Sequence, residues 1–148
     1  MANTLKRSKA SDQGTAPPPD PLPELRRLCL ALPETNERLS HGEPTWFVRD
    51  KKVFVSYADH HHDDRVAFVC AAPEGAQQAL IAADPKRFFR PPYVGHRGWL
   101  GVYLDLDEPV DWDLVAELVV EAYRVVAPRR LLAQLEERGV ATRRDPSA

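Results

Sequence analysis

The chain has 148 residues, of which 43% are hydrophobic, enough for one sizeable core but short for two ordinary domains. Its 20 Lys and Arg residues against 22 Asp and Glu residues give a net charge of −2. This balance excludes a global positive field that gathers polyanions, so a nucleic-acid site would have to be a local patch. No segment approaches the ~20 consecutive apolar residues that cross a bilayer, so we expect a soluble, cytoplasmic protein without a membrane partner.

The two ends of the chain differ in composition from its middle. Residues 1–21 contain no aromatic residue and carry a proline run, so they cannot bury enough apolar surface to offset the entropy of ordering. They are predicted to form a disordered tail. Residues 22–139 are predicted to form the domain, and residues 140–148 a flexible C-terminus.

Apolar spacing predicts the first elements of that domain in chain order. Helical spacing starts at Leu22 and stops at Pro33, which predicts a first helix. Two β-branched and aromatic runs, 45–48 and 53–57, flank the charged tetrapeptide 49–52 and predict a hairpin. A third strand is expected over 66–70, and a short helix opened by Pro73 follows it.

The second half of the domain adds a strand and two helices. Strict alternation from Leu100 to Leu106 predicts a strand with one buried face. Asp111 is the predicted N-cap of a helix whose apolar stripe is Leu114, Leu118, Ala122 and Val125. A second helix follows Pro128 and is predicted to end at Gly139. Short connections between strands predict an α+β fold, with an antiparallel sheet and helices packed on one of its faces.

Five segments of the chain resemble, in this order and spacing, the MmcQ/YjbR family. They are His41-Gly42-Glu43-Pro44-Thr45-Trp46-Phe47, Ala83-Asp84-Pro85-Lys86-Arg87-Phe88-Phe89, Pro91-Pro92-Tyr93-Val94-Gly95, Gly98-Trp99-Leu100-Gly101 and Ala122-Tyr123-Arg124-Val125-Val126-Ala127-Pro128. The resemblance implies an antiparallel α+β fold similar to the double-wing DNA-binding architecture and distantly to frataxin-like sandwiches. The family's DNA-binding label rests largely on fold analogy, which is a weak warrant for function.

The loop from Asp59 to Asp64 departs from the family pattern, because the usual Asn-His-His-Gly is replaced by Asp-His-His-His-Asp-Asp. Imidazoles and carboxylates are good zinc or nickel ligands, and His60 and His62 are the best candidates. Six consecutive residues cannot all converge on one ion, however. We therefore interpret the loop as an exposed hairpin tip and predict no metal site.

No catalytic constellation is visible. The serines lack a Gly-x-Ser-x-Gly elbow, and Cys29 and Cys70 sit among apolar residues, as reduced core thiols do. The glycines at 95, 98 and 101 enter a strand, whereas a phosphate cradle needs glycine before a helix. We expect a non-enzymatic binding module without a cofactor.

Two binding hypotheses remain open. Between Asp84 and Asp105 the chain has no acidic residue but carries five basic side chains. This loop and the lysines of the predicted hairpin could contact the DNA phosphate backbone as two wings. The residues predicted to bind nucleic acid are Lys86, Arg87, Arg90, His96, Arg97, Lys51 and Lys52.

The alternative is a small-molecule or protein-binding domain. Its pocket would lie between His41, Trp46, Tyr93 and Trp99. An aromatic-walled site with one titratable group should accept a small planar or anionic ligand. The sequence alone does not decide between the two hypotheses.

Overall fold

A computed structural model describes residues 19–59 and 64–143 of the chain, with side chains up to residue 138. The helices of this part are α2 (Leu22–Leu30), α3 (Ala76–Ala83), η1 (Gly95–Arg97, a 3₁₀ turn), α4 (Trp112–Val126) and α5 (Arg129–Arg143). The strands are β1 (Thr35–Ser40), β2 (Glu43–Val48), β3 (Lys52–Asp59), β4 (Val66–Cys70), β5 (Phe88–Phe89) and β6 (Leu100–Tyr103).

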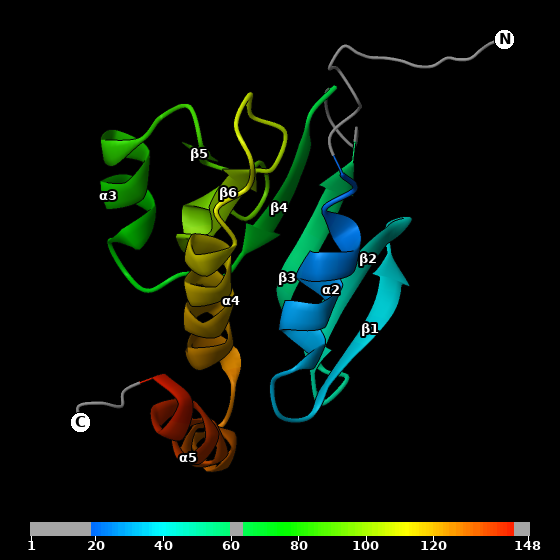
Figure 1. Cartoon of the computed structure of the whole chain (residues 1–148), viewed down its shortest axis with the longest axis vertical. Coiled ribbons are helices and arrows are strands. Elements are labelled where there is room, and N and C mark those ends of the chain that lie inside the picture. Colours follow the sequence, from blue (N-terminus) through cyan, green and yellow to red (C-terminus); the bar gives the residue numbers. More distant parts are fainter. Residues whose placement is uncertain (1–18, 60–63, 144–148) are drawn as a thin grey trace, which may run out of the picture.

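The strands form one sheet in the order β1-β2-β3-β4-β6-β5, and every neighbouring pair is antiparallel. Helices α2 and α4 lie against the same face of the sheet, and α5 lies beyond the lower end of α4 (Figure 1). The predicted α+β fold, with an antiparallel sheet and helices on one face, is confirmed. No helix of the described ranges has both the length and the apolarity to span a membrane.

The strand register assigns each residue to one of two faces, because directly opposed residues of an antiparallel sheet point the same way. One row lies on the helix-covered face and contains Glu37, Trp46, Val55, Cys70 and Leu100. The adjacent row lies on the helix-free face and contains Arg38, Thr45, Ser56, Val69 and Gly101.

The helix-covered face holds the main core. Phe54 occupies a bulge of β3 and meets the Tyr123 ring edge-on, with centroids 5.7 Å apart. The Tyr123 hydroxyl donates to the carbonyl of Pro33 at 2.7 Å. This bond joins α4 to the loop after α2 and satisfies a phenol that would be costly to bury unpaired.

Cys29 and Cys70 are free and buried in the same core, as expected. Burial raises the pKa of the Cys70 thiol to about 12 and that of Cys29 well above its ordinary value. Both thiols therefore stay protonated at neutral pH and act as small apolar side chains.

Strand β1 was absent from the sequence-based prediction, because TNERLS lacks an apolar alternation. Its polar side chains instead find specific partners. On the covered face, Glu37 accepts hydrogen bonds from Arg26 of α2 at 2.8 Å and from the Trp46 indole at 3.0 Å. On the other face, Asn36 and Arg38 both donate to Asp50, which lies in the β2–β3 turn. Side-chain hydrogen bonds thus attach this edge strand to the sheet.

The predicted strand from Leu100 to Leu106 is too long, since β6 ends at Tyr103. The chain turns away where Asp105 accepts hydrogen bonds from Arg65 and from the backbone N–H of Val66. These bonds lower the pKa of Asp105 against the opposing effect of burial. The two-residue strand β5 was not predicted, because Phe88-Phe89 is too short to show a period.

The predicted apolar stripe of α4 is right at Ala122, while Leu114 and Leu118 are only partly buried against the core. The buried residues are Val115, Val119, Ala122 and Tyr123, and Val125 is 47% exposed. The aromatic ring of Tyr123 dominates the burial and turns that side of the helix toward the sheet.

The predicted chain boundaries also need one correction. Helix α5 continues through Gly139 to Arg143, since one glycine costs a helix only about 1 kcal/mol. Residues 140–143 are therefore helical rather than a flexible C-terminus. Most of the predicted N-terminal tail lies outside the described residues, but the Asp20 carboxylate accepts the Leu22 N–H at the start of α2.

Candidate ligand-binding site

A cavity of about 600 Å³ lies on the helix-free face of the sheet, between its central strands and the 91–99 loop. Its lining comes from the end of β1, the β1–β2 turn, β2, β3, β4 and that loop: Ser40, His41, Glu43, Thr45, Phe47, Val53, Ser56, Tyr57, Ala58, Val69, Pro91, Pro92, Tyr93, Val94, Arg97 and Trp99. Aliphatic and aromatic groups predominate, with a few polar groups among them. This is the usual composition of a small-molecule pocket.

The cavity exists because the sheet presents small side chains there. Thr45 and Ser56 are directly opposed, and their hydroxyl oxygens are 3.3 Å apart. Thr45 also donates to the carbonyl of Glu43. Val69 and Ala58 complete this small-residue surface. Larger residues at these positions would fill the space beneath the loop.

The 91–99 loop forms the opposite wall. Trp99 is 6% exposed, and the guanidinium of Arg97 lies over its ring with the carbon 5.4 Å from the centroid. That distance is within the range of a cation–π contact. Tyr93 has a left-handed backbone, φ 68°, and its side chain is 81% exposed. The loop therefore offers one buried aromatic wall and a more open rim.

A buried glutamine of α3 holds this loop in place. Gln77 is 2% exposed, and its amide nitrogen donates to the carbonyls of Gly95 at 2.8 Å and Trp99 at 2.5 Å. Its amide oxygen accepts from Arg90 at 3.4 Å. One side chain thus satisfies two loop carbonyls and fixes the backbone on both sides of Arg97. Sequence reasoning missed Gln77, because a single glutamine in a short helix carries no periodic signal.

The rim opposite the loop is a tight turn between β1 and β2. His41 and Gly42 both have positive φ, 53° and 82°, as a two-residue hairpin of type I′ requires. Glycine takes this conformation freely, and the turn positions the exposed His41 side chain at the cavity. Tyr57 is directly opposed to Phe68, so its side chain lies on the covered face, where burial and the neighbouring Asp59 carboxylate raise its pKa.

Three of the four predicted pocket residues, His41, Tyr93 and Trp99, come together around this cavity. Trp46 does not. It lies on the helix-covered face, is fully buried and donates its indole N–H to Glu37. The prediction was wrong for Trp46 because adjacent residues of a strand point to opposite faces of the sheet. Only the strand register shows to which face the Trp46 side chain points.

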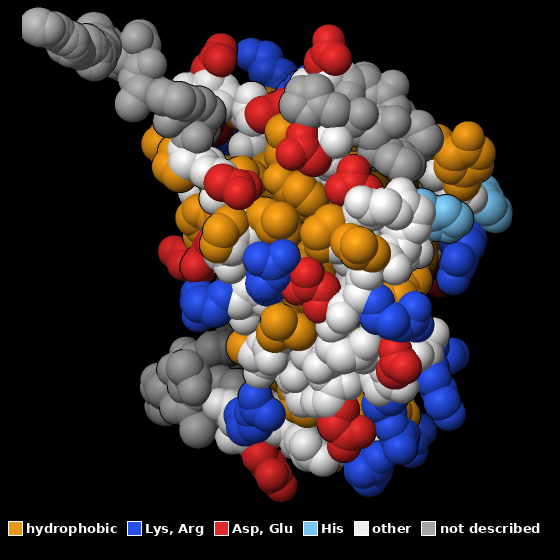
Figure 2. Space-filling view, turned by 90° about the vertical axis from the view of Figure 1, so that its right-hand side faces the viewer, with side chains coloured by type: hydrophobic (Ala, Val, Ile, Leu, Met, Phe, Trp, Pro, Cys, Tyr) orange, Lys and Arg blue, Asp and Glu red, His pale blue; other side chains and the backbone are white. Residues whose placement is uncertain are grey.

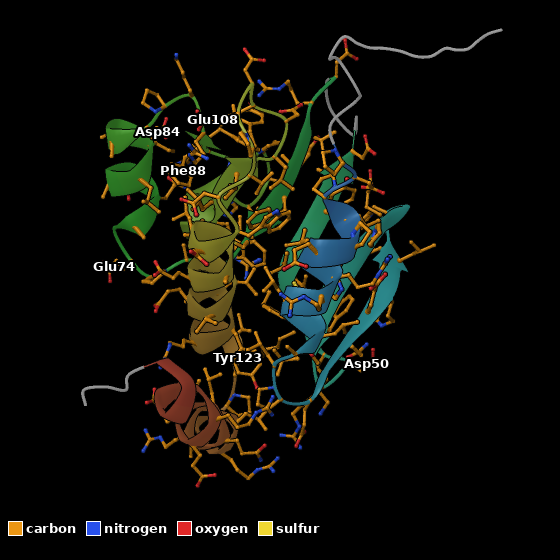
Figure 3. All side chains as sticks on the ribbon, in the orientation of Figure 1. Asp50, Glu74, Asp84, Phe88, Glu108 and Tyr123 are labelled. Atoms are coloured by element: carbon orange, nitrogen blue, oxygen red, sulfur yellow. The ribbon has the colours of Figure 1, made fainter. Side chains whose placement is uncertain are left out.

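The residues predicted for nucleic-acid binding come from two separate segments of the chain, 86–97 and 51–52. Lys86, Arg90, His96, Arg97, Lys51 and Lys52 are exposed. In Figure 3, Asp84, two residues before Lys86, and Asp50, next to Lys51, lie at opposite corners of the molecule. Figure 2 views the molecule toward β1 and shows hydrophobic side chains gathered above, with Lys and Arg side chains mixed with acidic ones below.

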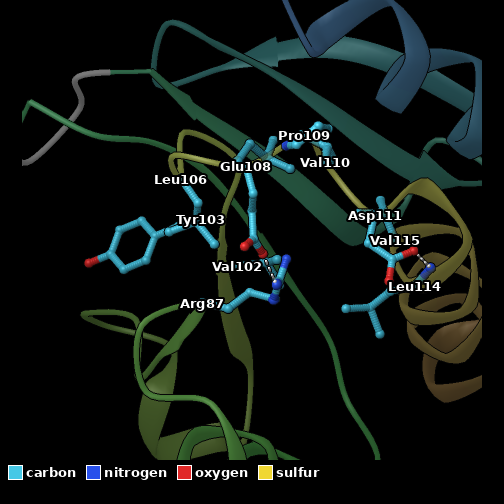
Figure 4. A pocket seen from close by; sticks show the side chains of 11 residues that line it. Arg87, Val102, Tyr103, Leu106, Glu108, Pro109, Val110, Asp111, Leu114 and Val115 are labelled. Carbon is cyan, nitrogen blue, oxygen red and sulfur yellow. Dashed lines mark hydrogen bonds and ion pairs between the residues drawn. The ribbon is translucent and has the colours of Figure 1, made fainter. Parts of the chain in front are cut away.

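Arg87 is engaged within the protein. Its guanidinium pairs with Asp84 at 3.0 Å and, as Figure 4 shows, with Glu108, at 2.5 Å. The Arg87 side chain is 18% exposed. The two carboxylates hydrogen-bond to it and raise its pKa further. The adjoining cavity measures about 10 Å³, no more than one water molecule needs. Arg87 therefore stabilises the loop after α3 and does not present a free charge to DNA.

The metal candidates His60 and His62 lie outside the described residues. Within residues 19–59 and 64–143, no group of three or more His, Cys, Asp or Glu side chains could hold a metal ion. Of the glycines at 95, 98 and 101, Gly98 has a positive φ of 83° and open space around it, whereas Gly95 and Gly101 are closely packed. A Cβ on Gly101 would collide with the Phe89 ring, so close approach of that ring requires glycine there.

These features define a class: an antiparallel α+β domain with a ligand-sized cavity on the helix-free face of its sheet. A family model described as YjbR matches residues 30–125. The chain belongs to the YjbR family.

A solved structure shares the fold. The crystal structure of Deinococcus radiodurans protein DR2400, with a domain described as DUF419, is similar at a TM-score of 0.54. Sequence identity is 16%, over 80% of each chain. At this identity the likeness concerns the fold alone. No curated protein matches the chain.

Proposed function

We propose that this chain is a non-enzymatic binding module that takes a small organic molecule with an apolar body into the helix-free-face cavity. The observation that carries the proposal is the cavity itself. Its volume of about 600 Å³ falls within the roughly 300–1,000 Å³ of ordinary ligand sites. Its walls are rich in aliphatic and aromatic groups, and the buried Gln77 holds the loop that closes it. A wall that is already ordered reduces the entropy lost on binding.

A neutral fluorescent probe, N-phenyl-1-naphthylamine, tests the proposal directly. Its fluorescence should rise saturably with one probe per chain. The variant Ala58→Trp places an indole in the cavity and should abolish the signal. The matched control Ala79→Trp adds the same indole on an exposed position of α3 and should bind like wild type. Equal binding by Ala58→Trp and wild type, with both folded by circular dichroism, would show that the cavity is not a binding site.

DNA binding through the 86–97 loop is the second candidate. It is favoured by the exposure of Lys86, Arg90, His96 and Arg97 in a segment without acidic residues. Fluorescence anisotropy on a labelled duplex should then show affinity falling with salt, with a log–log slope near −0.9 for each phosphate neutralised. Arg90→Glu with Arg97→Glu should abolish binding to all sequences, and Arg129→Glu on exposed α5 is the charge-matched control. Salt-insensitive signals, or equal binding by the double variant, would exclude this candidate.

A further inference from the structure

The arginines of the described residues divide into two groups. Most lie within 4.0 Å of a carboxylate oxygen: Arg26, Arg27, Arg38, Arg49, Arg65, Arg87, Arg124 and Arg130. Arg97 belongs to the second group, which has no carboxylate oxygen within that distance in the described part of the chain, and its guanidinium lies over the Trp99 ring. It is also the only arginine among the described residues that line the cavity. The cavity therefore contains a guanidinium whose hydrogen-bonding fork is available to a ligand.

The backbone around Arg97 is well ordered by its contacts. Gln77 binds the carbonyls of Gly95 and Trp99, which flank Arg97 in sequence. The Arg97 N–H donates to the carbonyl of Val94 at 3.0 Å. These bonds fix the base of the side chain, and stacking on Trp99 restricts its head. A guanidinium held this way loses less entropy on binding an anion than a mobile one.

The remaining charges at the site indicate how much negative charge a ligand should carry. Among the described lining residues the acid is Glu43, whose Oε2 accepts the Asp59 N–H at 3.3 Å. One acid against one arginine gives the Asp, Glu, Lys and Arg side chains of the lining a formal charge of zero. A single negative charge beside Arg97 suits this balance better than the double charge of a phosphate monoester.

Resting on the proposed function, we propose that the ligand class is a planar aromatic monocarboxylate. Its carboxylate pairs with the Arg97 guanidinium, whose planar fork matches two carboxylate oxygens. Its ring system lies along Trp99, toward the small side chains of Thr45 and Ser56. The Trp99 wall favours a flat body because offset stacking of aromatic rings adds to the burial of apolar area.

Isothermal titration calorimetry with four probes of one shape tests the inference. The probes are 2-naphthoate, neutral 2-naphthalenemethanol, cationic 2-naphthylmethylamine and 2-naphthyl phosphate. Wild type should bind 2-naphthoate about tenfold more tightly than the alcohol, the value expected of one charge-assisted hydrogen-bonded pair. The amine should bind most weakly. Arg97→Gln should abolish the preference for naphthoate over the alcohol, and Arg97→Lys should restore part of it. Arg129→Gln, which removes a charge from exposed α5, should retain the full preference.

The outcomes separate this inference from the proposed function. If naphthoate and the alcohol bind equally, and Ala58→Trp abolishes both, the cavity binds ligands but the carboxylate inference is wrong. A preference for the phosphate, or a naphthoate preference that survives in Arg97→Gln, overturns it as well. If neither the four probes nor the neutral fluorescent probe binds wild type, the proposed function itself is wrong.

Discussion

The two faces of the sheet are built from the same strands and differ in every property that matters for function. On the helix-covered face, Trp46, Phe54 and Phe68 are fully buried under α2 and α4. On the helix-free face, Thr45, Ser56 and Val69 leave space beneath a loop. Of two adjacent residues on one strand, one thus belongs to the packed core and the other to the cavity wall. Stability and binding can therefore be altered separately by choosing the face.

The largest expected effect contrasts neighbouring residues of β4. Phe68→Ala removes a fully buried ring from the covered face and should cost about 3–5 kcal/mol of unfolding free energy. Val69 is half-buried on the helix-free face, and its side chain already borders a cavity. Val69→Ala should therefore lower the free energy of unfolding by only roughly 1 kcal/mol. Urea denaturation measures both. Similar costs for the two variants would show that the faces are not energetically distinct.

The next effect concerns close packing at the end of the sheet. Gly101→Ala should destabilise the protein by about 1–3 kcal/mol, because the new methyl group meets the Phe89 ring. Phe89 stacks on Tyr103 with centroids 4.5 Å apart, so it cannot move without losing that contact. In the double variant with Phe89→Ala the methyl group has room, so the combined cost should be less than the sum of the single ones. Additive costs would contradict the clash.

Gln77 tests whether the cavity wall depends on its anchor on α3. Gln77→Leu leaves the carbonyls of Gly95 and Trp99 unpaired, so unfolding should cost about 1–3 kcal/mol less free energy than in wild type. Binding of N-phenyl-1-naphthylamine should weaken too, since the loop loses its anchor. Gln78→Leu, at the exposed neighbouring position, is the matched control. If Gln77→Leu is destabilised but binds the probe as tightly as wild type, the Gln77 hydrogen bonds are not needed for ligand binding in the cavity.

The smallest effect is the pH dependence of the edge strand. Hydrogen bonds from Arg26, against the opposing effect of burial, hold the pKa of Glu37 below its ordinary value. Its stabilisation is therefore present above the unfolded pKa of about 4.3 and is lost as pH falls through the lower, folded pKa. Glu37→Gln should cost about 1 kcal/mol at pH 7 and progressively less toward pH 3. Thermal melts of wild type and variant across this range measure the difference.

Glu136→Gln is the control for that measurement. Its pair with Arg124 is about half exposed, so the variant should change stability by less than about 0.5 kcal/mol at pH 7. A Glu37→Gln cost that stays constant down to pH 3 would contradict the assignment of Glu37 as a charged partner of Arg26.

The sequence by itself determined the α+β class, the hairpin 45–57, the strand 66–70, the helix starting after Asp111 and the family. Each depends on local signals: period, caps and ordered motifs. Strand β1 could not be predicted, because its stability comes from Glu37 and Asp50 pairing with residues distant in sequence. The α4 stripe was misassigned because the Tyr123–Pro33 contact is equally non-local.

Tertiary structure alone decided what the candidate residues do. His41, Tyr93 and Trp99 were predicted from composition, but the β register separates Trp46 from them, and no local pattern encodes register. Arg87 and Arg97 look alike in sequence. Two carboxylates, one of them brought close by the turn after β6, neutralise Arg87, while the anchor from Gln77 holds the backbone around Arg97 at the cavity. Whether a charge is paired or available depends on contacts between distant segments, and only folding creates those contacts.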